Sequence, residues 1–378
     1  MSVDAWGFDV QRQATARRLR SLRIRLSAVR SAVAAAVTLA LLFGGAGALR
    51  DSVLSLPIPS WAATVTFLAA LFAIVTMVDL PFRYVGGYRL EREFGLSTQH
   101  VTGWLKDLVK SFALGLGSTV AAGYVLLWLL AVSPMWWWLA AWMISLAVSV
   151  VLAFLAPIVL VPLFYRFRPL GDPNLRARFE SLAAQAKVPI VGVFELRASE
   201  KTRRSNAAVM GLGRTRRVVV TDTLLRDFRP EEVETVLAHE LAHQKFLDPL
   251  RGFVFGSLTS VVTLAVAAWI YSILYSSFGI RSIGDMAGLP LLAAVLGLVS
   301  FPLRPLELWW SRAREARADR FSLELTHDPA NFASAMAKLH DQNLGVADPK
   351  PWEKWLFYSH PPGRERVELA RSYHGSPA

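Results

Sequence analysis

Two histidines four residues apart are the residues of this chain best suited to binding a metal ion. They lie in the segment His239-Glu240-Leu241-Ala242-His243, which matches H-E-x-x-H. Positions i and i+4 of a helix share one face, with Cβ atoms roughly 5–6 Å apart, so one zinc ion can take both imidazoles. Glu240 adjoins the first ligand and is placed to act as general base toward a zinc-activated water. The competing interpretation is an amphipathic helix whose histidines only pack.

A catalytic zinc needs a third protein ligand and an open position for water. Two apolar runs follow His243, and the chain that emerges from them carries Glu315 and Asp319, again an i, i+4 pair. We expect Glu315 to be the third ligand and Asp319 to accept the free N–H of a ligand histidine. The alternative is a surface helix in which both acids pair with neighbouring arginines. The first interpretation predicts one Zn²⁺ per chain.

The composition requires a membrane part in addition to a polar part. Of the 378 residues 53% are hydrophobic and 19% charged, with a mean hydropathy of +0.37. That average is too apolar for a soluble enzyme and too charged for a purely intramembrane bundle. The chain has no cysteine, which excludes disulfides, thiolate zinc sites and cysteine nucleophiles.

Six apolar runs are long enough, at roughly 20 residues, to cross a bilayer. They cover residues 31–49, 61–80, 111–132, 136–164, 253–278 and 289–310. Pro157 and Pro162 predict a kink or an early end in the fourth run. We therefore expect six transmembrane helices and leave a seventh open.

The basic residues indicate which segments face the cytoplasm. Of the 41 lysines and arginines, 38 lie in residues 1–30, 81–110, 165–251 and 312–371. Six spans place all of these segments on one side, so both termini and the catalytic face are predicted to be cytoplasmic. The net charge of +12 is then mostly a topology signal, and nucleic-acid binding is not expected.

This topology divides the chain into five parts. They are a basic N-terminus (1–30), a four-span region (31–164) with a cytoplasmic loop (81–110), a catalytic segment (165–250), two further spans (251–310) and a C-terminal helical segment (311–378). Within the catalytic segment, residues 173–186 predict a helix and residues 190–196, 207–212 and 217–221 predict strands, the last two forming a hairpin. Asp227 or Arg229-Pro230 opens the helix of the H-E-x-x-H motif. The fold class is thus a polytopic α-helical membrane protein with a small α+β, zincin-like catalytic domain at the cytoplasmic face.

These segments together resemble the type-I CAAX prenyl proteases, a family of integral-membrane zinc metalloproteases. Besides H-E-x-x-H, the resemblance rests on EREFGLSTQ (91–99), PLF (162–164), SNA (205–207), TDTLL (221–225), EARAD (315–319) and SHPP (359–362) followed by ER (365–366). The family has seven spans around a large water-filled chamber, one span more than we count here.

The resemblance implies roles for individual residues. It assigns the zinc ligands to His239, His243 and Glu315 and the water-activating base to Glu240. It places Asn206 and Ala207 on a substrate-facing edge strand, a role that fits the pairing of an extended peptide with a sheet edge. It also implies that His360 stabilises the oxyanion and that Arg366 lies near the same site. Four further histidines (His100, His327, His340 and His374) have no partner at ligand spacing, so we expect them to be surface or core residues.

The predicted function is therefore a membrane-embedded zinc endopeptidase. The resemblance implies peptide or protein substrates that are prenylated near the C-terminus. The 33 arginines against 8 lysines hint at a GC-rich, bacterial genome and hence a bacterial cytoplasmic membrane. In that case a quality-control or peptide-degrading protease without a prenyl requirement is the alternative. A non-catalytic membrane scaffold or transporter with a structural metal is more remote, because it would have no need of Glu240.

Overall fold

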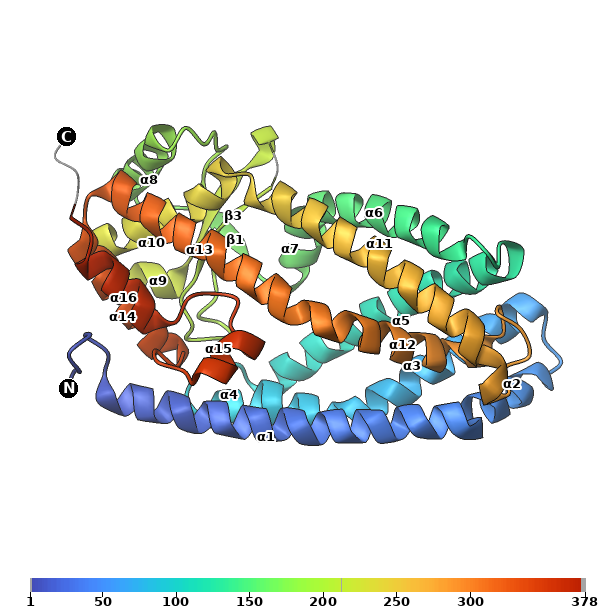
Figure 1. Cartoon of the computed structure of the whole chain (residues 1–378). Helices are drawn as coiled ribbons and strands as arrows, with labels where there is room; N and C mark the ends of the chain where they lie inside the picture. Colours follow the sequence, from blue (N-terminus) through green and yellow to red (C-terminus); the bar gives the residue numbers. More distant parts are fainter. Residues whose placement is uncertain (1, 212, 375–378) are drawn as a thin grey trace.

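The computed structural model describes residues 2–211 and 213–374. The molecule is elongated, with long helices running along it and a small sheet with shorter helices at one end (Figure 1). Helix α1 begins, and helix α16 ends, at this sheet-containing end. This arrangement matches the expectation of an even number of spans.

Six helical segments of the described chain are long and apolar enough to cross a membrane, as predicted. They are Val10–Leu54, Ser60–Glu93, Val101–Val132, Trp137–Phe164, Asp248–Phe278 and Met286–Thr326. The first begins well before its apolar run, so the basic N-terminal segment continues as one helix into the first half of the first span, and a kink at Phe43 and Gly44 separates the second half. The apolar faces of these helices are largely exposed on the protein. Such surface is stable only against lipid or other apolar partners.

Several of the six segments contain more than one helical element. The α-helices are α1 (Val10–Ala40), α2 (Ala46–Leu54), α3 (Ser60–Tyr84), α4 (Leu90–Glu93), α5 (Val101–Val132), α6 (Trp137–Leu155), α7 (Val161–Phe164), α11 (Asp248–Leu274), α12 (Leu289–Ser300) and α13 (Arg304–Thr326). Single π-helical turns join them at η2 (Val85–Arg89) and η3 (Ala156–Leu160), whereas at η1 (Leu41–Gly45) the backbone of Phe43 and Gly44 leaves helical geometry and α1 and α2 meet at a kink. Turn η3 contains Pro157, where the sequence predicts a kink.

A four-stranded sheet forms the centre of the end that contains the predicted catalytic segment (165–250), which we call the catalytic end. Its strands are β1 (Phe167–Pro169), β2 (Val193–Leu196), β3 (Ala207–Met210) and β4 (Arg217–Thr221), in the order β1-β2-β4-β3. Strands β3 and β4 form the predicted antiparallel hairpin, and β2 pairs with β4 in parallel. Strand β1 was not predicted, because three residues ending in proline show no alternation of hydrophobicity. Position 212, at the end of the second predicted strand (207–212), lies outside the described residues.

The helices of the catalytic end pack on this sheet and on each other. They are α8 (Pro173–Gln185), α9 (Asp222–Asp227), α10 (Pro230–Lys245), α14 (Pro329–Asn343), α15 (Pro351–Phe357) and α16 (Gly363–Arg371). Helix α8 is capped by Asp172, which accepts hydrogen bonds from the backbone N–H groups of Asn174 and Leu175. Helix α10 is buried on most of its surface between the sheet, α13 and α14. It is therefore a rigid support for the motif that it carries.

An ion-pair cluster joins the membrane helices to the catalytic end. Glu91 in α4 pairs with Arg23 of α1 and with Arg204, whose Nη2 lies 2.9 Å from Oε2 of Glu91. Arg204 precedes β3 by three residues. The N-terminal half of the chain thus contacts the segment that leads into the edge strand.

Candidate metal centre

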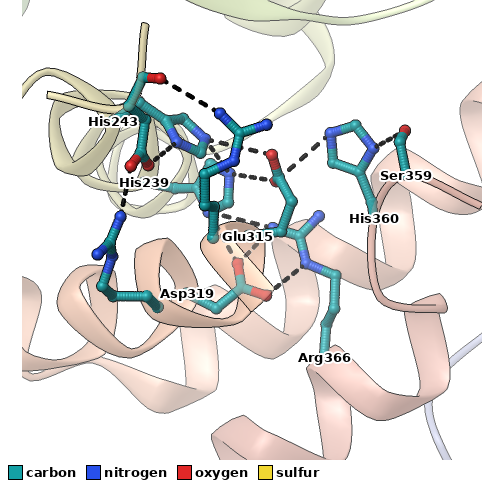
Figure 2. Close-up of polar contacts among 10 residues, drawn as sticks. His239, His243, Glu315, Asp319, Ser359, His360 and Arg366 are labelled. Carbon is teal, nitrogen blue, oxygen red and sulfur yellow. Dashed lines mark hydrogen bonds and ion pairs between the residues drawn. The ribbon is translucent and has the colours of Figure 1, made fainter. Parts of the chain in front are cut away.

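Helices α10 and α13 bring the three predicted ligands together (Figure 2). The Nε2 atoms of His239 and His243 lie 3.2 Å apart. Carboxylate oxygens of Glu315 lie 3.1 Å from Nε2 of His239 and 3.5 Å from Nε2 of His243. One ligand atom from each of the three residues lies within 4.8 Å of the other two. This geometry requires both the turn of α10 and the return of the chain through α11, α12 and α13.

These atoms fit a zinc ion. Zinc–nitrogen and zinc–oxygen distances of roughly 2.1 Å at tetrahedral angles place neighbouring ligand atoms roughly 3.3 Å apart. The observed separations lie close to this value. Two imidazoles and one carboxylate are the donor set of a catalytic zinc site, with one coordination position left for water.

The second ring nitrogen of each histidine donates to a carboxylate. Nδ1 of His239 lies 2.8 Å from Oδ1 of Asp319, the partner predicted from the sequence. Nδ1 of His243 lies 2.9 Å from Oδ2 of Asp248, which was not predicted. Both carboxylates are buried. They fix the tautomer in which Nε2 of each ring faces the metal position.

Asp248 follows Leu247, which has left-handed backbone geometry with φ of 53°. This turn ends the motif helix and points the first residue of α11 back toward His243. The sequence pattern Asp-Pro predicts the start of a helix, but it does not predict the direction in which the chain turns between α10 and α11. Nothing in the spacing alone therefore identified Asp248.

Negative charge dominates the immediate surroundings of His239. Burial acts to lower the pKa of His239, but the carboxylates of Asp319 and Glu315 outweigh it and raise the pKa to about 9. The site therefore attracts positive charge, which a bound divalent cation would supply.

Arg366 lies behind the ligands on α16. Its Nε lies 2.9 Å from Oδ2 of Asp319, and its Nη2 bonds to the other oxygen of that carboxylate. Burial acts to lower the pKa of Arg366, but Asp319 outweighs it, so the guanidinium stays charged. The structure thus brings Arg366 to the site through Asp319.

A cavity of about 260 Å³ adjoins His239, one of the three predicted ligands. Its wall includes His239, Glu240, Asn206, His360 and Arg366, so five residues named from the sequence meet around one space. Burial raises the pKa of Glu240, against the opposing effect of the two ligand histidines. A raised pKa suits a carboxylate that must accept a proton and later release it.

Strand β3 lies at the edge of the sheet beside this cavity. The N–H of Thr221 in β4 donates to the carbonyl of Asn206. Alternate residues of an antiparallel strand point their backbone groups the same way, so those of Ala207 point away from β4. The carbonyl of Val209, two residues on, accepts a hydrogen bond from Gln244 of α10. The structure therefore places Asn206 at the cavity and the backbone of Ala207 along the outer edge.

His360 lies at the exposed side of the ligand cluster. Its Nε2 is 3.4 Å from Oε2 of Glu315, and its Nδ1 is 2.9 Å from the hydroxyl of Ser359. Figure 2 shows the ring beside the carboxylate, on the side away from His239 and His243. This position leaves the imidazole free to meet a group that enters from solvent.

His340, which was expected to be a surface or core residue, also lines the cavity. Its Nδ1 donates to the carbonyl of Met336, 2.9 Å away. Burial lowers the pKa of His340 to about 4, with help from the charge of Arg366, so the ring is neutral. A single histidine without a partner at ligand spacing gives no pattern in the sequence, so the position of His340 in the cavity wall could not be predicted.

Comparison with protein families gives two matches that together cover most of the chain. Residues 169–374 match the model of peptidase family M48. Residues 9–166 match a model described as the CAAX prenyl protease N-terminal domain, with five membrane helices. That segment of this chain contains four of the six long apolar helices among the residues that the structure describes.

Individual proteins are similar over a comparable range. A Bacillus subtilis protein described as an uncharacterized metalloprotease, YhfN, is 31% identical over 83% of this chain and 74% of its own. A rice protein named CAAX prenyl protease 1 homolog is 30% identical over 80% of this chain and 72% of its own. The crystal structure of Ste24p from S. mikatae superposes with a TM-score of 0.84 at 25% identity, covering 97% of this chain and 90% of that one.

Proposed function

The chain belongs to peptidase family M48 and is an integral-membrane metalloprotease, and we propose that it is a zinc endopeptidase with Glu240 as general base. The observation that carries this proposal is the convergence of His239, His243 and Glu315 beside the cavity that Glu240 lines. A structural metal would need no such space and no carboxylate at this position.

When bound, zinc would act as a Lewis acid that activates a water molecule and polarises the scissile carbonyl. His239, His243 and Glu315 would hold it, with Asp319 and Asp248 keeping the two imidazoles in the correct tautomer. Glu240 would take the proton from the attacking water and later deliver it to the leaving amine.

The substrate would enter as an extended strand. The outward backbone groups of Ala207 would pair with it, and Asn206 would contact it from the cavity wall. This pairing would fix the position of the scissile carbonyl relative to the metal ligands, and it would not depend on the identity of the substrate's side chains.

His360 would then stabilise the negative charge that develops on the carbonyl oxygen. Its exposed ring, beside Glu315, lies on the side from which a substrate would come. Arg366 would act indirectly, by holding Asp319 and hence His239 in place.

For the substrate, we propose proteins or peptides prenylated near the C-terminus, because several similar proteins carry the name CAAX prenyl protease 1. A second candidate is a bacterial peptide-degrading or quality-control protease without a prenyl requirement. The similarity to a Bacillus metalloprotease and the excess of arginine over lysine favour it. Both candidates share the same catalytic residues. In either case we propose that the catalytic face and both termini are cytoplasmic.

The test is cleavage of a farnesylated CAAX peptide by purified, zinc-loaded protein, followed by mass spectrometry. The unmodified peptide and the Glu240→Gln variant serve as controls. Cleavage next to the modified cysteine by the wild type alone supports the first candidate. Equal cleavage of the unmodified peptide supports the second, and no cleavage of either peptide by a folded, zinc-bound sample contradicts the first.

A further inference from the structure

A groove between α1 and α3 has features that the protease activity does not use. One part of it, with a volume of about 330 Å³, is lined by six apolar residues, by Thr38 and, at one end, by Arg30, Asp79 and Arg83. The other part, of about 450 Å³, lies nearer the catalytic end, where residues of α5 also line it. Arg30, Phe82 and Arg83 line both parts.

The spacing of the lining residues shows that the two parts are continuous. On α1 they fall at positions 23, 26, 27, 30, 34, 37, 38 and 41. On α3 and the turn after it they fall at 75, 78, 79, 82, 83, 86 and 87. Steps of three and four keep residues on one helical face. Each helix therefore contributes a single face to one groove.

Charge is concentrated where the two parts of this groove meet. Asp79 accepts from Nε of Arg30 at 2.6 Å and from Nε of Arg83 at 2.7 Å. Both guanidiniums are about half exposed, and one carboxylate cannot neutralise two of them. Asp79 thus holds the two arginines in fixed positions and leaves N–H groups of each available to an anion.

The surrounding ion pairs do not cancel this excess. The charged lining residues and the ion-pair network to which they belong hold five cations and three carboxylates: Arg23, Arg30, Arg83, Arg204 and Lys201 against Asp79, Glu91 and Asp107. The balance is a surplus of two positive charges. An anionic group bound at this position would neutralise the surplus through charge-assisted hydrogen bonds.

The apolar part has the dimensions of a lipid tail. From Arg30 to Leu41 the groove runs eleven residues along α1, or about 16 Å at 1.5 Å per residue. Half of a hydrocarbon core of about 30 Å is close to this length. Trp104, a residue type enriched at membrane interfaces, lines the charged end and marks the depth of the headgroups.

We propose that this groove binds one anionic phospholipid. The phosphate would bond to Arg30 and Arg83, with Arg23 contributing charge, and one acyl chain would lie between α1 and α3 along Val37, Leu41 and Val75. This assignment is independent of the catalytic mechanism, because none of these residues touches the metal centre.

The experiment is native mass spectrometry of the full, delipidated protein with equal amounts of phosphatidylglycerol and phosphatidylcholine of the same acyl composition. The wild type should retain phosphatidylglycerol in clear preference. Arg30→Gln and Arg83→Gln should each lower its retention by about fivefold, the effect of one arginine near a lipid headgroup. Each variant leaves Asp79 one arginine partner. Arg281→Gln, an exposed arginine paired with Asp51 elsewhere, is the matched control and should not differ from the wild type.

A second pair of variants tests the groove without changing its charge. A Cβ added at Gly87 meets no atom within 4 Å, so Gly87→Leu fills the charged end without a clash at its Cβ. Ala34→Phe blocks the apolar part. Both should reduce lipid retention. Equal retention of the two lipids by the wild type, retention by the groove variants equal to that of Arg281→Gln, or full displacement of phosphatidylglycerol by inorganic phosphate would each overturn the proposal.

Discussion

At the scale of single residues, the two ligand histidines are held from behind by carboxylates of different helices. Asp319 lies on α13 and accepts hydrogen bonds from Arg366 of α16. Asp248 begins α11 and is paired with Arg317 of α13. Each carboxylate is thus held by an arginine of its own, so each imidazole is oriented by a chain of charged hydrogen bonds. Loss of one carboxylate should weaken the metal site without abolishing it.

Asp248→Asn is expected to lower zinc affinity by about 10- to 100-fold, because an amide side chain no longer favours the tautomer that presents Nε2 of His243. The measurement is competition for zinc with a chelator of known affinity. Asp227→Asn, which changes a carboxylate of the catalytic end away from the metal site, is the control. Equal affinities in the two variants would contradict the role given to Asp248.

Glu240→Gln is expected to keep one zinc per chain and to lower kcat by about 10²- to 10⁴-fold, the contribution of a general base. Zinc content is measured by elemental analysis and turnover on a cleavable peptide. His239→Ala should lose the metal as well as the activity. Glu234→Gln, on the same helix but paired with Arg178, should leave both unchanged. Full turnover in Glu240→Gln would refute the mechanism.

His340 should make the stability of the catalytic end depend on pH. Its pKa is lowered to about 4 in the folded protein, against about 6.5 in an unfolded chain. Between these values the unfolded state binds the proton and the folded state does not, so stability should fall as the pH falls from 6.5 to 4. In thermal unfolding at pH 7 and pH 5, His340→Asn should lose less stability on acidification than the exposed-site control His100→Asn. Equal losses would count against a neutral, buried His340.

At the scale of elements, helix α10 is fixed at its first turn by Glu232. This fully buried carboxylate accepts from the backbone of Arg229, from Ser334 at 2.6 Å and from Lys338 at 2.8 Å. The last two residues belong to α14. One side chain thus caps the motif helix and joins it to its neighbour, which keeps the ligand positions two turns further on in register.

Glu232→Gln is expected to lower the free energy of unfolding by about 2 kcal/mol, since Lys338 loses its charged partner. Burial acts to raise the pKa of Glu232, but Lys338 and Ser334 outweigh it, so the pKa lies below its usual 4.5. The carboxylate therefore stabilises the fold above about pH 4.5, and this contribution is lost as the pH falls through the lowered pKa. Denaturant unfolding of Glu232→Gln and of the control Glu231→Gln, at a pH above and a pH below 4.5, measures both the loss of stability and its pH dependence. Identical unfolding midpoints for the two variants at neutral pH would refute the predicted loss of stability.

The local elements were largely predictable and the long-range contacts were not. Helices α8 and α10, the β3–β4 hairpin and the six apolar helices follow from periodicity, proline and glycine positions, which are local signals. Glu315 could be found because two apolar runs must return the chain to one side of the membrane. Asp248 reaches the site through the left-handed turn at Leu247, and His340 reaches it through the packing of α14. Neither feature produces a periodic pattern in the sequence.

At the scale of the whole molecule, α1 begins and α16 ends at the catalytic end of a six-helix membrane part (Figure 1). Both ends of the chain should therefore face the same compartment as the metal centre. The three short connections at the far end, after α2, between α5 and α6 and before α12, should face the other.

The absence of native cysteines makes this arrangement directly measurable. Ser372→Cys should react in intact cells only with a membrane-permeant maleimide, because the proposed location of α16 is cytoplasmic. Ser55→Cys, in the exposed connection after α2, should react with an impermeant one. The reverse pattern would invert the proposed topology while leaving the metal centre unaffected.

The separation of the ligands between α10 and α13 has a consequence for the biosynthesis of the enzyme. When a ribosome has made the H-E-x-x-H helix, the polypeptide still lacks Glu315, Asp319 and Arg366, which follow only after two more membrane helices. A nascent chain therefore cannot assemble the centre, and it cannot cut itself or its insertion machinery. The three ligands can therefore meet only once α13 has been made, and the support of Asp319 by Arg366 follows when α16 has folded.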